Sequence, residues 1–283
     1  MGLRSDFTRG PDRVQMHLNW GFSTRQVLWT LTFAAQLVLL VVLLGRDRMR
    51  RYPWFTAAGV LFALQLMAEM LLAGRMAMLP FQEILLALGD LAVILGLLVV
   101  VEMARRAFAG APRSLWMVNA AGLLVVASGV LAVWGPWPVW KDMALDTLLG
   151  KLRLMQLAAQ KGDTLVALLT VGLGLLVVIF GRRFKAGWRS HTQMIVIGLS
   201  TAAIALLATQ GAVQSIAKMA HPHSRAEYEQ ILGLVSNLVN ANQVVYLAAQ
   251  LWWIVWLWRD EPGTVAAELT PADSAEISAE GEQ

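Results

Sequence analysis

Seven long apolar runs separated by short polar segments constrain this chain more than any other feature of its sequence. A helix needs about 20 residues to cross the ~30 Å hydrocarbon core of a bilayer, and each run is long enough to do so. Of the 283 residues 57% are hydrophobic and only 15% are charged, whereas about a quarter are charged in soluble domains. The predicted fold class is therefore an all-α membrane protein, a seven-transmembrane-helix bundle. The predicted spans are Val27–Leu44, Trp54–Ala73, Phe81–Met103, Leu115–Trp134, Thr164–Gly181, Thr192–Ile216 and Ile231–Trp256.

The composition divides the chain into three regions. Residues 1–23 form a polar N-terminal segment, residues 24–258 the seven-span membrane domain, and residues 259–283 an acidic tail. The tail is rich in Glu, Asp, Ala, Ser, Thr and Pro and has almost nothing to bury. We therefore expect the tail to be disordered.

The long connection between the fourth and fifth spans carries a helical pattern of its own. We expect an amphipathic helix over residues 141–162 on the outer side, either as a surface connection or as a lid over the bundle. Asp163 would then be the N-cap of the fifth span. The apolar positions of this helix are Leu145, Leu148, Leu152, Met155 and Ala159.

The distribution of basic residues predicts the orientation in the membrane. The loops after the first, third and fifth spans are short and rich in arginine, whereas those after the second and sixth spans hold only Arg75, Lys218 and Arg225. Basic loops stay in the cytoplasm. We therefore predict a multi-pass protein of the plasma (inner) membrane with its N-terminus outside and its C-terminus in the cytoplasm. The basic loop residues are Arg46, Arg48, Arg50, Arg51, Arg105, Arg106, Arg113, Arg182, Arg183, Lys185 and Arg189.

Asp90 is an acid inside the third apolar run. It lies about ten residues from the start of the span, ~15 Å along the helix, which predicts a position near the bilayer midplane. The apolar parts of the runs contain no Lys, Arg or His to neutralise it. Because an uncompensated charge there is costly, Asp90 is either protonated and hydrogen-bonded to a carboxamide of the last span, or it faces water, a cation or an amine-bearing ligand.

Amides and acids on other spans could line a site with Asp90. Ser236, Asn240, Gln243 and Gln250 form a polar stripe along the last span, and lipid cannot satisfy their hydrogen bonds. We predict an outward-opening polar pocket between spans two, three, six and seven. Alternatively, the amides only join neighbouring helices. The candidate ligand-binding residues are Asp90, Glu69, Asn240, Gln243 and Gln210.

Several kinds of chemistry are not expected. His221 and His223 precede the last span and could hold a divalent metal, but Pro222 between them restricts the geometry and an ordinary polar loop explains them better. The four histidines lie near the span edges, which argues against haem, and the last span has no lysine for a retinal. The sequence shows no cysteine, no nucleophile–His–acid set and no phosphate loop. We predict no catalytic residue, no metal and no cofactor.

One set of residues resembles a known group of proteins. The run Arg51-Tyr52-Pro53-Trp54-Phe55 begins the second span, and Glu102 with Arg105 and Arg106 closes the third. This pattern is similar to a group of uncharacterised bacterial seven-span proteins. The resemblance covers the first three spans and implies no activity. The seven-span layout is also similar to the membrane sensor modules that precede bacterial histidine kinases.

These observations predict a non-enzymatic membrane sensor or binding module. Its expected partners are the lipid bilayer and a cytoplasmic or membrane protein that contacts the arginine-rich edge. We expect no nucleic acid, since there is no soluble domain to present a basic face. Two alternatives remain open: a small transporter in which Asp90 exchanges a proton or cation, and an accessory subunit of a larger membrane complex.

Overall fold

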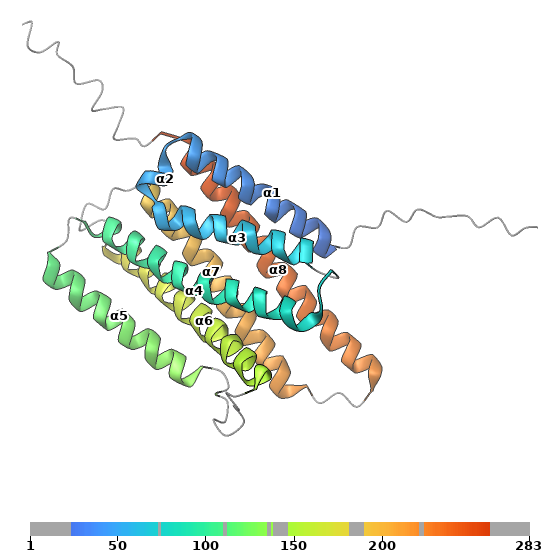
Figure 1. Cartoon of the computed structure of the whole chain (residues 1–283). Coiled ribbons are helices and arrows are strands. Elements are labelled where there is room, and N and C mark those ends of the chain that lie inside the picture. The colour runs from blue at the N-terminus through green and yellow to red at the C-terminus, as the bar shows by residue number, and fades with distance from the viewer. Residues whose placement is uncertain are drawn as a thin grey trace, which may run out of the picture.

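The computed structural model describes residues 24–72, 75–109, 112–134, 137, 147–180, 190–220 and 224–260, and all regular structure in these ranges is helical (Figure 1). The helices are α1 (Thr24–Gly45), α2 (Arg48–Arg51), α3 (Pro53–Leu72), α4 (Met78–Ala107), α5 (Arg113–Val133), α6 (Leu148–Phe180), α7 (His191–Met219) and α8 (Arg225–Trp258). The prediction of an all-α fold is confirmed.

Six of these helices are long and apolar enough to cross a membrane, namely α1, α3, α4, α6, α7 and α8. Helix α5 covers the fourth predicted span, but its described apolar part, Met117–Val133, is shorter. Large apolar side chains remain exposed on the outside of the bundle; Val118 and Val125 on α5 are each 69% exposed. Such a surface fits a bilayer as the surrounding medium.

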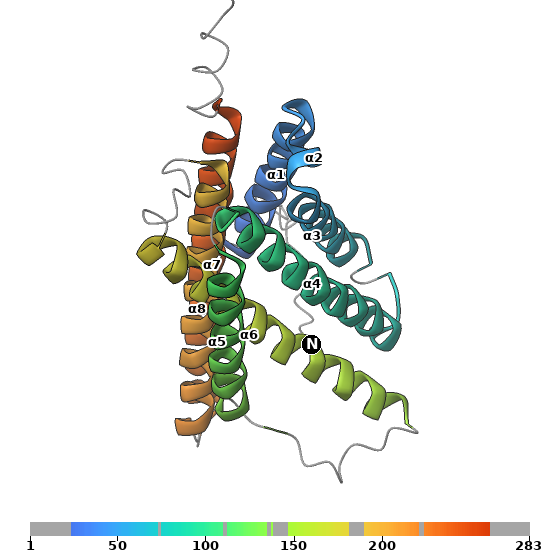
Figure 2. The ribbon, with the colours of Figure 1, turned by 90° about the vertical axis from the view of Figure 1, so that its left-hand side faces the viewer.

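The six long helices form a closed ring. Each packs against the next in the order α1, α3, α4, α6, α7 and α8, and α8 packs back against α1. Helix α5 lies outside the ring, mainly against α6. Figure 2 shows α7 and α8 running side by side while α4 and α6 run obliquely to them. The interior of the ring is the place where all six helices can contribute to one site.

Small residues let neighbouring helices of the ring approach closely. A methyl group added at Gly96 on α4 would lie 3.0 Å from Val166 on α6, and one added at Gly198 on α7 would overlap the indole of Trp253 on α8. Lipid is as apolar as the helix surfaces, so the hydrophobic effect does not drive helices together inside a bilayer. Van der Waals contact at such close approaches drives their association there.

The two ends of the bundle are packed differently. Buried residues in α4 begin at Val99, those in α7 end at Ala203, and those in α8 begin at Ala249. We call the end that holds these residues the packed half; it includes the arginines of α2 and those that end α4. We call the other end the open half. In Figure 2 the start of α6 and the start of α8, both in the open half, lie apart.

The predicted outer helix over residues 141–162 is not a separate element. Residues 141–146 lie outside the described residues, and residues 148–162 are the first turns of α6, which continues without interruption to Phe180. Asp163 is therefore inside a helix, and its prediction as an N-cap is wrong. The physical reason is that Leu152, Thr164 and Ala167 are buried along one continuous helix. The N-terminal segment 1–23 and residues 261–283 also lie outside the described residues.

Candidate functional site

Asp90 lies against α6 and not against the amides of α8. The preceding Gly89 faces Ala159, with 3.8 Å between an added methyl and that Cβ atom, and Asp90 is close enough to Asp163 for the two charges to interact. Among the described residues neither carboxylate has an ion-pair partner, and the predicted hydrogen bond from a carboxamide of the last span is not formed. Asp90 is seventeen residues from the end of α4, about 25 Å at the helical rise, and lies near the middle of this 30-residue helix.

The other candidate residues are distributed over separate contacts. Glu69 on α3 forms an ion pair with Arg25 of α1 at 3.2 Å, and the side chains are 44% and 76% exposed, respectively. Gln210 on α7 accepts a hydrogen bond from the Thr164 hydroxyl of α6 at 3.2 Å. These contacts join neighbouring helices of the ring, which is the alternative that the sequence left open for its polar residues.

Asn240 and Gln243 lie on the part of α8 that has no buried residue. The side-chain oxygen of Gln243 is enclosed and has no hydrogen-bond partner within the described part of the chain. His221 and His223 lie outside the described residues, and the described ranges contain no cluster of residues able to hold a metal. Two cavities lie in the packed half, and none of the five predicted ligand residues lines either of them.

The first cavity, of about 120 Å³, lies inside the ring. Every helix of the ring contributes to its wall, and the wall is mainly aliphatic and aromatic. Phe55 and Trp253 meet edge to face with centroids 5.3 Å apart, and Tyr246 lies 6.3 Å from Trp253 in the same manner. The lining residues are Gln36, Leu39, Leu43, Phe55, Ala58, Gly59, Gly96, Val99, Val100, Val166, Thr170, Leu199, Tyr246 and Trp253.

A chain of amides borders this central cavity. The Gln250 side-chain NH₂ of α8 donates to the Gln36 carbonyl oxygen of α1 at 2.6 Å, and the Gln36 NH₂ donates to the Gly59 backbone carbonyl of α3 at 2.9 Å. Gln36 is 1% exposed and Gln250 is fully buried, while the Tyr246 hydroxyl lies beside Gln250. The chain therefore ties three helices together at the cavity and places polar groups next to an apolar space.

Sequence reasoning found only part of this site. Gln250 belonged to the predicted polar stripe of the last span, and the structure confirms that it faces the interior. Gln36 was missed, although a single amide in the first apolar run was the available signal. The aromatic wall gave no signal, because Phe55, Tyr246 and Trp253 are ordinary residues for the ends of membrane helices.

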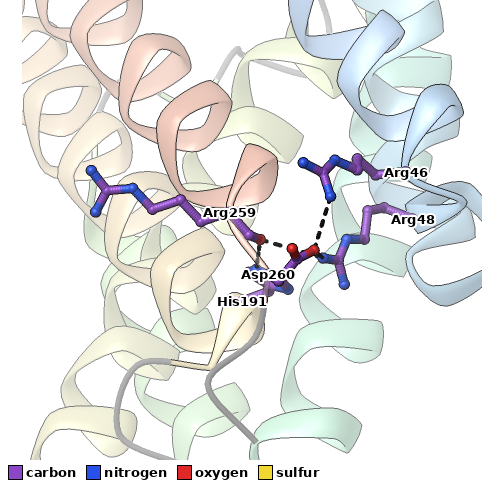
Figure 3. A network of polar contacts seen from close by, with 5 residues as sticks. All are labelled: Arg46, Arg48, His191, Arg259 and Asp260. Atoms are coloured by element: carbon purple, nitrogen blue, oxygen red, sulfur yellow. Dashed lines mark hydrogen bonds and ion pairs between the residues drawn. The ribbon is translucent and has the colours of Figure 1, made fainter. Parts of the chain in front are cut away.

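A second polar cluster closes the packed end of α8 (Figure 3). Asp260 accepts a hydrogen bond from Arg46 at 2.9 Å and lies 4.0 Å from Arg48. The backbone carbonyl of Arg259 accepts from Arg48 at 3.4 Å and from the His191 ring at 3.0 Å. We call these five residues the C-terminal clamp, because they fasten the end of α8 to the turn after α1, to the start of α2 and to the start of α7.

The residues that carried the resemblance to seven-span proteins also converge at the packed end. Pro53 begins α3, and the Glu102 carboxylate of α4 accepts the backbone N–H of Phe55 at 3.1 Å. Arg106 lies 3.6 Å from Glu102 and 5.0 Å from the centre of the Tyr52 ring. Glu102 thus satisfies one of the N–H groups that a helix start leaves free, in the place where negative charge is favoured.

Comparisons of this chain with protein-family models, with curated proteins and with solved structures find no match. The assignment of a function therefore rests on the geometry of the cavity, the clamp and the α3–α4 contact.

Proposed function

We propose that this chain is an integral membrane binding module, sensor-like and not an enzyme, that holds a small apolar molecule inside its helix ring. The observation that carries the proposal is the central cavity, to which all six long helices contribute. A molecule bound there contacts every helix of the ring, so its binding can change the packing of all six helices.

The size and chemistry of the cavity define the class of ligand. An engineered apolar cavity of about 150 Å³ in another protein stays dry and binds benzene or xenon, and this cavity, at about 120 Å³, is of similar size. The wall offers three aromatic faces, and most of its polar atoms already bond to the protein itself. A compact apolar or aromatic molecule with at most one polar group fits this lining.

Helix α8 connects the cavity to the packed end. Trp253 lies in the cavity wall, and its indole N–H donates to the Ile195 carbonyl of α7 at 3.3 Å. Arg259, whose carbonyl is held in the clamp, follows six residues later, about 9 Å along the helix. A ligand that displaces Trp253 would therefore shift the set of contacts that fastens α8 to α1 and α7.

The arginine distribution supports a cytoplasmic position for the packed end and an outside position for the N-terminus. In this arrangement α5 is a seventh span at the edge of the ring, and the chain is multi-pass in the plasma (inner) membrane. A protein partner that contacts the arginine-rich end would then receive the signal from the clamp.

Binding is tested with benzene as the probe. Thermal unfolding of the full-length chain in detergent is followed with and without benzene for the wild type, Ala58→Leu and Ala57→Leu. Ala58 lines the cavity and its neighbour Ala57 does not, so only the first substitution fills it. We expect benzene to raise the unfolding temperature of the wild type and of Ala57→Leu, because a ligand that binds only the folded state stabilises it. Equal shifts in all three proteins contradict the proposal.

The signalling role is tested separately with spin labels. The sequence has no cysteine, so labels attach only to cysteines that are introduced. Spin labels at Met49→Cys on α2 and Val255→Cys on α8 report the separation of the two elements that the clamp joins, at positions that are 47% and 49% exposed. Benzene should change the distance distribution, and Ala58→Leu should remove that change. Binding without any change in distance would leave a binding module and contradict the sensor role.

A second candidate function has one observation in its favour. Asp90 and Asp163 lie on facing helices, and their charges are close enough to interact without a described cation between them. Two such acids in a membrane domain favour exchange of a proton or a cation. Proton flux in proteoliposomes tests this alternative: flux that is lost in both Asp90→Asn and Asp163→Asn supports a transporter, and no flux above empty vesicles contradicts it.

A further inference from the structure

The second cavity of the packed end is an open cleft of about 520 Å³ between the start of α3 and the end of α4. Pro53 and Trp54 form its α3 side, and Leu98, Val101, Arg105 and Arg106 form its α4 side, with Glu102 at its floor. The central cavity shares none of these residues. The cleft is therefore independent of the proposed ligand site inside the ring.

The cleft carries one positive charge that the protein does not use. Glu102 is 5% exposed in its side chain and is engaged by the Phe55 N–H and by Arg106, so these two neighbours offset its charge. Arg105 is exposed and has no hydrogen-bond or ion-pair partner among the described residues. An arginine presents five N–H donors in a planar fork that matches phosphate oxygens.

The cleft changes from charged to apolar along α4. Leu98, Val101 and Arg105 are spaced three and four residues apart, so they lie on one face of the helix over about 10 Å. Trp54, which is 44% exposed, lines the cleft from the α3 side, next to Phe55, whose N–H bonds to Glu102. Tryptophan is enriched at the depth of lipid headgroups. The cleft thus combines an arginine near the end of α4, an indole on the α3 side and an aliphatic strip that continues along α4 away from that end.

We propose that this cleft binds an anionic phospholipid, with the headgroup phosphate on Arg105 and an acyl chain along Leu98 and Val101. Free phosphate would use only the arginine and leave the aliphatic strip empty. A zwitterionic lipid would bring a second, positive group towards Arg105 and Arg106. The charge and the apolar strip together therefore select a lipid with net negative charge.

The test uses the full-length chain purified in a neutral detergent, with phosphatidylglycerol as the probe. Phosphatidylcholine and glycerol phosphate, which is an anionic headgroup fragment without acyl chains, are the comparison ligands. Native mass spectrometry counts retained lipid, and a titration gives the affinity. The variants are Arg105→Gln and a matched control, Arg50→Gln. Arg50 lies at the same end, outside the cleft, and its side chain is 86% exposed.

We expect the wild type to retain phosphatidylglycerol in preference to both comparison ligands. Arg105→Gln should weaken this binding about fivefold, the equivalent of ~1 kcal/mol for one arginine at an anionic membrane surface, and Arg50→Gln should leave it unchanged. Equal losses in the two variants, or equal retention of phosphatidylcholine, would show a general charge effect and overturn the proposal. Glycerol phosphate that binds as tightly as the lipid would overturn the role of the aliphatic strip. Binding of phosphatidylglycerol, phosphatidylcholine and glycerol phosphate to the wild type tests the proposal even if a variant fails to fold.

Discussion

The packed half and the open half of the bundle are built from the same six helices but hold together by different means. In the packed half, α1, α3 and α8 share the Gln36–Gln250 amide chain, and Glu102 joins α4 to the start of α3. In the open half, Glu69 pairs with Arg25 at the surface, and α8 has no buried residue before Ala249. The open half also has hydrogen bonds between helices, from Gln65 to the Leu88 carbonyl and from Thr164 to Gln210, but these amides are only partly buried. What distinguishes the packed half is that the side chains joining its helices are buried.

The largest expected effect comes from removing the buried acid of the packed half. Glu102→Ala leaves the Phe55 N–H and Arg106 without their partner, and we expect a loss of about 2–4 kcal/mol in the free energy of unfolding. Glu69→Ala, the matched change in the open half, should cost less than about 1 kcal/mol because its ion pair lies at the surface, with side chains 44% and 76% exposed. Unfolding from mixed detergent micelles measures both, and similar losses would show that the halves do not differ.

A second prediction places the same substitution in each half and expects opposite signs. Gly198→Ala on α7 drives a methyl into Trp253, and overpacking of this kind costs about 1–3 kcal/mol. Gly233→Ala on α8 meets nothing within 4 Å and should stabilise the helix by about 0.5–1 kcal/mol. The unfolding titration separates the two changes by their sign. A stabilising Gly198→Ala would mean that α7 and α8 are not in close contact.

The third prediction concerns the amide chain beside the cavity. A double-mutant cycle with Gln36→Leu and Gln250→Leu should give a coupling of about 0.6 kcal/mol, the average for hydrogen bonds between membrane helices, and at most about 1.7 kcal/mol. Gln243→Leu is the control in the open half. Its side-chain oxygen has no described partner, so this change should be neutral or stabilising. A coupling near zero would remove the amide chain as a link between α1 and α8.

The sequence predicted the helices of this fold but not their rotation. Long apolar runs are sufficient to locate α1, α3, α4, α5 and α7 to within four residues at each end, because backbone groups in a bilayer must bond within their own helix. Helix α8 begins six residues before the predicted span. Which face of α4 turns inward depends on packing at Gly96 and its neighbours, which hydropathy does not encode. Asp90 therefore faces α6, whereas the predicted site needed it to face α8. The N-cap prediction for Asp163 failed for a related reason. A residue that favours helix starts does not interrupt a helix whose buried face continues on both sides of it.

The smallest expected effect is at the C-terminal clamp. Asp260 is 64% exposed in its side chain, and its pair with Arg46 is at the surface, so Asp260→Asn should change the free energy of unfolding by less than about 1 kcal/mol and less still at high salt. The proposed function requires a weak contact here. A ligand shifts the equilibrium between a closed and an open clamp only by its difference in affinity for the two states. The free energy needed to open the clamp must therefore be small enough for a small ligand to supply. In the proposed sensor, Asp260→Asn has its main effect on conformation. In samples without benzene it should broaden the distribution of distances between spin labels at Met49→Cys and Val255→Cys. A large loss of stability with an unchanged distribution would contradict the proposed movement of the clamp.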